Sequence, residues 1–318
     1  MPPRRAVFIL NPAARGAPSP ERLGAAIERA AGARLEAVIR TTERPAHATV
    51  LAREAEAEGA EVIFACGGDG TINEVLNGLS DPDTRVGLVP AGTANVWAKE
   101  AGVPRDAAGA IRAQLDARPV RIDLGRAGER RFLLMASLGL DAATAAAVSP
   151  RLKRLTGGLA YVLTAVRTGV LYRGHHLAIG FDDDPPRELA ANMVVIGNTR
   201  LYGGVVEITA QASAIDGQID CVVFRGAGPL PALRGLSLTL LRRHLRSGVV
   251  LFRRAREIRV EPLDARHPLL QVDGDVVSPA GARREELPAR FTVEPRAVTM
   301  LVPKAERPVF QPLPLRRG

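Results

Sequence analysis

The run Gly67-Gly68-Asp69-Gly70-Thr71 has the clearest chemical use in the sequence. It joins an apolar, strand-like stretch to a helix-like stretch. Glycine permits tight turns and lets a phosphate approach the backbone closely. The first turn of the following helix offers unpaired N–H groups and a positive dipole end, and both favour an anion. The run is neither a P-loop nor the dinucleotide fingerprint. It indicates a phosphate-binding turn, and a strand-to-helix turn without a ligand remains the alternative.

A second small-residue turn, Pro90-Ala91-Gly92-Thr93, follows the apolar stretch 85–89 and precedes a helical stretch that opens at Asn95. If both apolar stretches are parallel strands of one sheet, their carboxyl ends meet at the same edge. Two such turns side by side favour a shared phosphate or ribose site more strongly than either turn does alone.

The elements around these turns alternate along the first part of the chain. Strand-like runs occupy 4–10, 34–40, 61–65 and 85–89, and helical spacing occurs at 20–31, 46–58, 71–79 and from 95. This order predicts a mainly parallel sheet covered by helices. Beyond about residue 124, short apolar runs separated by Gly, Pro and Asp predict an antiparallel β-rich domain. Helical insertions are expected at 155–172 and 229–246.

We therefore expect an α/β domain over residues 1–124 and a β-rich domain over 125–294. A segment near 295–303 is expected to return to the first domain. The remaining tail, 304–318, is rich in Pro and Arg and is expected to be disordered.

The composition of the 318 residues narrows the class of partner. The net charge of +9 indicates an anionic partner, and an aromatic content of 4% is low for base stacking, so we expect no nucleic acid. Cys66 and Cys221 are too few for a disulfide framework. The longest apolar stretches fall short of the roughly 20 residues of a spanning helix. We expect a soluble cytoplasmic protein in peripheral contact with the inner face of the membrane.

The two turns belong to longer motifs that resemble the diacylglycerol kinase catalytic family, which is related to sphingosine and ceramide kinases. The motifs are GGDGTINEVLNGL at 67–79 and LVPAGTANVWAKEAGVP at 88–104. The segments VFILNPAARG (7–16), TTERPAHATVLARE (41–54), IDGQID (215–220) and VDGD (272–275) follow the family's order. The resemblance covers the chain to about Val302.

This resemblance implies an N-terminal nucleotide-binding domain like those of NAD kinases and phosphofructokinases, followed by an antiparallel β-sandwich. It implies a soluble lipid kinase that uses ATP and Mg²⁺ to phosphorylate a lipid alcohol, with diacylglycerol as the expected acceptor and a role in phospholipid biosynthesis. The positions that match the family's ATP contacts are Thr42, Gly67, Gly68, Asp69, Gly70, Thr71, Ile72, Asn73 and Thr93.

The same matching assigns metal and catalytic roles. A structural Mg²⁺ falls on Asp216, with Ser213 and Gln218 contributing carbonyls, and the catalytic base falls on Asp275. Asp69 is the best candidate to hold the Mg²⁺ carried with ATP, through water. Asp275 stands where the family usually has glutamate, and Val96 stands where kinase members often have aspartate.

Several alternatives remain open. The acceptor could be another lipid alcohol such as a sphingoid base, and the two departures also leave room for a nucleotide- and lipid-binding regulator without catalysis. Asp273-Gly274-Asp275 taken alone is typical of a hairpin turn. The sequence leaves open whether the protein forms a homodimer.

Two apolar stretches with basic flanks suit an anionic membrane. In 150–174 apolar residues recur at helical spacing beside Arg151, Lys153 and Arg154, and 233–248 repeats the mixture with further arginines. We expect both apolar stripes to pack inward on the β domain and the basic side chains to face anionic lipid.

Overall fold

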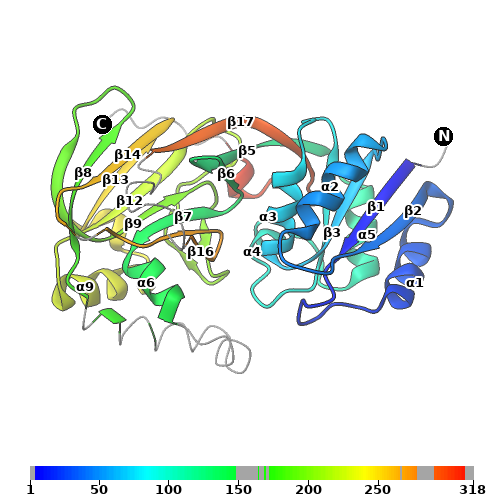
Figure 1. Cartoon of the computed structure of the whole chain (residues 1–318), viewed down its shortest axis with the longest axis horizontal. Helices are drawn as coiled ribbons and strands as arrows, with labels where there is room; N and C mark the ends of the chain where they lie inside the picture. The colour runs from blue at the N-terminus through cyan, green and yellow to red at the C-terminus, as the bar shows by residue number, and fades with distance from the viewer. Residues whose placement is uncertain are drawn as a thin grey trace. The chain divides into compact units, whose positions relative to one another are not determined.

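The computed structural model describes residues 4–147, 164, 168–169, 172–265, 267–277 and 290–311. The chain divides into two compact units. The first contains Met1–Leu124, Ala214–Asp216 and Glu294–Gly318, and the second contains Gly125–Ser213 and Gly217–Val293. Figure 1 labels their helices and strands. Positions 150–163, which include Arg151, Lys153 and Arg154, lie outside the described residues.

The first unit is built on a parallel sheet with the order β17-β4-β3-β1-β2. Its strands are β1 (Arg4–Leu10), β2 (Leu35–Thr41), β3 (Val62–Gly67), β4 (Arg85–Pro90) and the end of β17 (Arg290–Leu301). All six residues of β3 are buried, as expected for a central strand covered on both faces. The carboxyl ends of β1, β3 and β4 therefore lie at one edge of the sheet.

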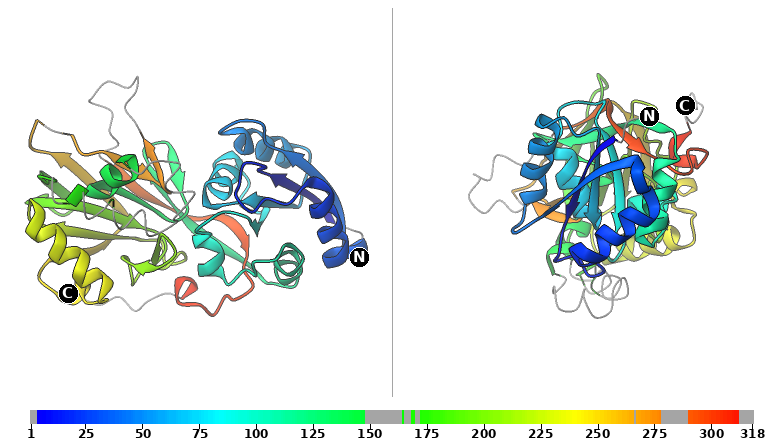
Figure 2. Two further views of the ribbon diagram at one scale, coloured as in Figure 1. Left: turned by 90° about the horizontal axis from the view of Figure 1, so that it is seen from below. Right: turned by 90° about the vertical axis from the view of Figure 1, so that its right-hand side faces the viewer.

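Helices cover both faces of this sheet (Figure 2). The helices α1 (Pro20–Ala31) and α5 (Ala107–Leu115) share one core with the inward side chains of β1 and β3, including Phe8 and Phe64. On the other face, α2 (His47–Ala57) contacts β1, and α3 (Asp69–Gly78) contacts β3. The short helix α4 (Val96–Ala101) follows β4.

The second unit is a β-sandwich whose strand pairs are antiparallel. The strand β9 (Arg187–Gly197) pairs with three others, β7 (Met135–Gly139), β8 (His175–Phe181) and β12 (Ile219–Arg225). This branching folds the strands over one apolar core. The other elements are β5 (Pro119–Ala127), which begins in the first unit, β6 (Arg130–Phe132), α6 (Leu140–Ala147), β10 (Leu201–Tyr202), β11 (Val206–Glu207), α9 (Pro229–Leu240), β13 (Val250–Ala255), β14 (Glu257–Pro262), β15 (Leu270–Val272) and β16 (Asp275–Val277).

The architecture is thus the expected α/β unit together with a β-sandwich. The described part of the tail differs from expectation, because 304–311 is ordered rather than disordered. Val309 and Phe310 are buried, and the Phe310 ring meets Trp97 edge-on with centroids 5.7 Å apart. The backbone N–H of Ala214 donates to the Val309 carbonyl at 2.8 Å. Burial of two apolar side chains outweighs the local bias of the Pro- and Arg-rich sequence.

Candidate active site

The first glycine turn is shaped by the contact between Gly67 and Thr71. β3 ends at Gly67, and α3 begins at Asp69 after the extended residue Gly68. A Cβ on Gly67 would lie 2.3 Å from the Thr71 Oγ1, so only glycine fits there. The Asn11 Nδ2 donates to that same Oγ1 at 3.0 Å. The loop after β1 is thereby tied to the loop after β3.

The two glycine turns touch each other. A Cβ added to Gly92 would lie 2.5 Å from the Gly68 Cα, a distance that no folded backbone tolerates. The Ala91 N–H also donates to the Gly67 carbonyl at 2.7 Å. Asn95 closes the second turn, because its side chain accepts from the Gly92 N–H at 2.8 Å and donates to the Gly92 carbonyl at 2.9 Å. The sequence prediction that both turns share one sheet edge is confirmed.

Asp69 joins the two turns electrostatically. Its Oδ1 accepts a hydrogen bond from the Trp97 N–H at 3.1 Å, in the first turn of α4. Burial raises the pKa of the Asp69 carboxyl, while hydrogen bonds from the Val96 and Trp97 backbones and the charge of Lys99 oppose that rise. The carboxylate is therefore partly desolvated beside two helix N-termini, where a cation would favour its ionised form.

The other predicted ATP contacts differ in what they expose. Thr93 is exposed in the second turn, and Gly70 is exposed in the first turn of α3. Thr42 follows β2, and its N–H donates to the Leu10 carbonyl at 2.8 Å. Ile72 and Asn73 are buried, so the Ile72 side chain packs in the core. The Asn73 amide oxygen accepts from the Asn77 side chain at 3.2 Å.

The predicted metal ligands lie where the chain passes between the units. Asp216 belongs to the first unit, and Ser213 and Gln218 belong to the second. Among the described residues, no three His, Cys, Asp or Glu side chains gather as a metal site. The Mg²⁺ ligand set at Asp216 therefore stays a prediction.

Asp275 lies in the second unit, in the hairpin of β15 and β16. Asp273 and Gly274 have φ of 49° and 89°, the positive pair that a tight two-residue turn requires. The Asp273 carboxylate accepts three backbone N–H groups between 2.7 and 2.9 Å, from Leu133, Leu134 and Met135. Asp275 itself is exposed and pairs with Arg130 at 2.7 Å. The hairpin is thus real, and it presents an accessible carboxylate.

A buried polar network supports this hairpin and was missed in the sequence. The Gln271 Oε1 accepts from the Gly274 N–H at 2.6 Å, and the Gln271 Nε2 donates to the Asp141 Oδ2 at 2.8 Å. Ser137 and Tyr202 also donate to the Asp141 carboxylate. The network joins three separate stretches of the sequence, 137–141, 202 and 271–274, so no local pattern connects them.

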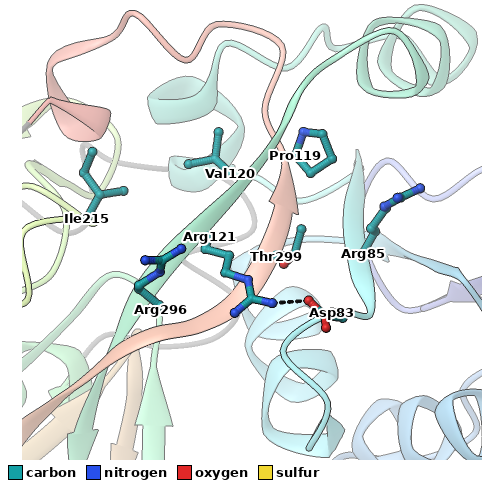
Figure 3. A pocket seen from close by; sticks show the side chains of 8 residues that line it. All are labelled: Asp83, Arg85, Pro119, Val120, Arg121, Ile215, Arg296 and Thr299. Carbon is teal, nitrogen blue, oxygen red and sulfur yellow. Dashed lines mark hydrogen bonds and ion pairs between the residues drawn. The ribbon is translucent and has the colours of Figure 1, made fainter.

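A cavity of about 690 Å³ in the first unit is lined by residues that include Asp83, Arg85 and Arg121 (Figure 3). None of the residues that line it belongs to the glycine turns. It opens at the amino end of β4, near Arg85, whereas the turns follow the carboxyl ends of β3 and β4. Arg121 pairs with Asp83 at its wall, and the Thr299 hydroxyl donates to the Pro82 carbonyl at 2.6 Å. The candidate site is defined by the glycine turns and not by this cavity.

Known proteins match both parts of the chain. The sequence profile of the "Diacylglycerol kinase catalytic domain" matches residues 5–127, and that of the "YegS C-terminal NAD kinase beta sandwich-like domain" matches residues 135–302. A protein of Pseudomonas syringae pv. tomato named "Probable lipid kinase YegS-like" is 35% identical over 87% of each chain. The diacylglycerol kinase of Bacillus subtilis is 27% identical over 95% of this chain and 97% of its own.

Solved structures show the same fold. A crystal structure described as a diacylglycerol kinase from Bacillus anthracis has a TM-score of 0.72 at 20% identity, covering 94% of this chain and 96% of its own. An NAD kinase from Archaeoglobus fulgidus in complex with ATP has a TM-score of 0.51 at 12% identity, covering 95% of each chain.

The fold and these matches define the class of protein as a lipid kinase. The chain belongs to the diacylglycerol kinase-like family, with the YegS type of C-terminal β-sandwich. Among the described residues, no helix combines the length and apolar character needed to cross a membrane.

Proposed function

We propose that this lipid kinase transfers the γ-phosphate of ATP to the hydroxyl of diacylglycerol, forming phosphatidate. The observation that carries the proposal is the contact between Gly68 and Gly92, with Asp69 bonded across it to Trp97. Two helix N-termini and two side-chain-free turns at one sheet edge make a cradle suited to a chain of phosphates. The diacylglycerol kinases among the relatives support the choice of acceptor.

The nucleotide phosphates are assigned to the first turn of α3. Gly68 and Gly70 carry no side chain between the backbone and an approaching phosphate. The exposed Thr93 stands on the neighbouring loop, where its hydroxyl can bond phosphate or ribose, and the assignment of the buried Thr42 to the nucleotide rests on the family resemblance. The chain's own contribution is to fix the phosphates in place, which is most of what phosphoryl transfer demands.

The donor set at Asp69 fits Mg²⁺ that arrives with ATP. Magnesium is commonly held by one or two carboxylates, substrate phosphates and water. The Asp69 carboxylate already accepts hydrogen bonds from the Val96 and Trp97 backbones, and a carboxylate has about four acceptor positions, so it can also bond water around an ion. Asp69 would therefore hold the hydrated ion, and the bound ion would neutralise charge on the transferred phosphate. The assignment of a second, structural Mg²⁺ to Asp216, Ser213 and Gln218 rests on the family resemblance.

Asp275 is proposed as the base that orients the lipid hydroxyl and finally takes its proton. The exposed carboxylate can accept a hydrogen bond from an alcohol, and it pairs with Arg130 at 2.7 Å. The hairpin that carries Asp275 is held from behind by Asp273 and Gln271, so the backbone beneath the acid is fixed. We place the reaction at the inner face of the cytoplasmic membrane, where the lipid acceptor resides.

An acceptor panel tests the proposal. Diacylglycerol, ceramide and a sphingoid base, each with short chains and fully dispersed, are compared with ATP and Mg²⁺, and lipid phosphates are identified by mass spectrometry. We expect the highest kcat/KM for diacylglycerol. A higher value for a sphingoid base would move the assignment to that class, and ATP binding without any lipid phosphate would favour a regulator.

A further inference from the structure

The helix α9 exposes leucines at its two ends, leaves Leu236 and Leu238 half-buried, and buries small residues. Leu230 is 79% exposed, Leu240 is 55% exposed and the following Leu241 is 64% exposed. The buried positions of the helix are Ala232, Gly235 and Thr239. A surface helix normally buries its large apolar side chains and shows its small and polar ones. At Leu230 and Leu240 this relationship is reversed.

The inward face explains why the helix packs this way. A Cβ on Gly235 would come within 2.8 Å of the Phe224 Cδ1, so the helix backbone lies almost directly on β12. Small residues allow that close approach and leave no room for leucine beneath the helix. The expectation that the apolar stripe of 233–248 packs inward is therefore wrong for Leu240 and Leu241, and Leu230, just before that stretch, is exposed as well.

Arginine dominates the charge around this face, and the acidic Glu207 lies on the neighbouring strand β11. The side chains of Arg234, Arg242, Arg243 and Arg246 are exposed. Residues 221–256 contain eight arginines and neither aspartate nor glutamate. A neighbouring apolar residue adds to the same region, because β11 contacts α9 and Val205, next to it in the β10–β11 hairpin, is 71% exposed. Figure 1 shows α9 at one end of the strands of the second unit.

We infer that α9, together with the segment Leu241–Arg246, rests in the interface of an anionic membrane. The exposed leucines would enter the boundary between headgroups and acyl chains, and the arginines would meet the anionic headgroups. This inference rests on the proposed function, since a lipid kinase must reach its acceptor in a bilayer. It names the element and the face that make the contact.

The charge pattern selects a membrane over a second copy of this chain. A two-fold contact between copies places the same patch against itself. Here it would bring Arg234, Arg242 and Arg243 of one chain toward those of the other, and like charges brought together are unfavourable. Anionic lipid offers the opposite charge and an apolar layer below it, which matches both features of the face.

Sedimentation with sucrose-loaded vesicles tests the inference on the full chain. The vesicles are pure phosphatidylcholine or phosphatidylcholine with 30 mol% phosphatidylglycerol. The test variant is Leu230→Gln/Leu240→Gln/Leu241→Gln. The matched control is Val38→Gln, an apolar side chain of the first unit that is 50% exposed. We expect the parent and the control to bind anionic vesicles alike, and the triple variant to bind at least tenfold more weakly.

Two further measurements make the result specific. Arg242→Gln/Arg243→Gln should weaken binding to anionic vesicles severalfold and should reduce its dependence on salt. Light scattering of the parent and the triple variant should give the same mass. Unchanged vesicle binding by the triple variant would overturn the inference, as would a parent dimer that the triple substitution converts to a monomer, which would assign the face to a second copy.

Failure of this inference is distinguishable from failure of the proposed function. Turnover of a short-chain, dispersed diacylglycerol needs no membrane, so the triple variant should retain the parent's kcat on it. Vesicle binding that depends on the leucines, without turnover of any dispersed lipid, would support the docking face and reject the kinase proposal. If the parent and the triple variant turn over dispersed diacylglycerol equally and also bind vesicles equally, the kinase proposal is supported and the docking face is rejected.

Discussion

The Asp69 carboxylate and the Trp97 backbone are joined by a hydrogen bond of 3.1 Å that crosses from one glycine turn to the other. Asp69 begins α3, and Trp97 lies in the first turn of α4. One side chain therefore fixes the mutual placement of two helix N-termini. The same carboxylate is proposed to hold the Mg²⁺ that accompanies ATP, so Asp69 has both a structural role and a role in binding the metal.

Replacing that carboxylate by an amide separates its two tasks. In Asp69→Asn the side-chain oxygen can still accept from the Trp97 N–H, but the negative charge is gone. We expect lipid phosphorylation to fall by at least a hundredfold while circular dichroism stays that of the parent. Turnover within a factor of a few of the parent would remove Asp69 from the reaction.

The pH dependence of stability gives an independent check on Asp69. Because burial raises its pKa in the folded state, protonation favours the fold. This contribution is fully present below the ordinary aspartate pKa of about 3.9 and is lost as pH rises through the higher folded value. Without nucleotide, Asp69→Asn should therefore be at least as stable as the parent at neutral pH. A lower melting temperature for the variant at pH 7 would contradict this reading.

The close approach of the glycine turns predicts a severe effect at Gly92. In Gly92→Ala the new Cβ would meet the Gly68 Cα at 2.5 Å, so one backbone must move. We expect ATP affinity, measured by calorimetry, to fall at least tenfold and the melting temperature to drop by several degrees.

Gly70→Ala is the matched control, because a Cβ at Gly70 meets no atom within 4 Å. Alanine in the first turn of α3 should leave the melting temperature unchanged or slightly raised. If phosphate lies over this turn, the exposed methyl should still weaken ATP binding. Equal melting temperatures for both variants would count against the contact between the turns.

Asp275 is expected to matter for rate and little for stability. Its pair with Arg130 is exposed, and such pairs contribute about 1 kcal/mol or less. Positioned acid–base groups typically supply about 10²–10⁴-fold. Asp275→Asn should therefore lower kcat by that factor with little change in ATP affinity. Asp275→Glu, which restores the family's usual side chain, should keep substantial activity. If Asp275→Asn keeps the parent's kcat, Asp275 is not the catalytic base.

Asp273, two residues away, should behave in the opposite way. Its carboxylate accepts the N–H groups of Leu133, Leu134 and Met135, and Asp273→Ala would leave them without that acceptor. An unsatisfied buried donor costs about 1–3 kcal/mol. Urea unfolding should show a loss of at least that size for Asp273→Ala and almost none for Asp275→Ala. Equal losses of unfolding free energy in the two variants would contradict the assignment of a structural role to Asp273 and a catalytic role to Asp275.

The strand-to-helix turns could be predicted because each is determined by residues within one short stretch of sequence. A buried strand followed by glycine and a helical pattern places Gly67–Gly70 at the edge of a parallel sheet without further information. The bonds from Asn11 to Thr71 and from Asp69 to Trp97 could not be predicted, because they join residues 60 and 28 positions apart. The spacing of apolar residues also gave the wrong inward face for α9, because that face is set by the close contact between Gly235 and Phe224. The order of 304–311 depends likewise on a distant partner, Trp97.

The most direct test of the central claim follows the γ-phosphate itself. The full chain is mixed with γ-labelled ATP, Mg²⁺ and dispersed short-chain diacylglycerol, and label is measured in the extracted lipid alongside ADP. The account predicts one labelled phosphatidate for each ADP formed, and at least a hundredfold less of both with Asp69→Asn or Asp275→Asn. Two results would contradict the account: ADP formed by the parent without labelled lipid, or as much labelled lipid formed by the two variants as by the parent.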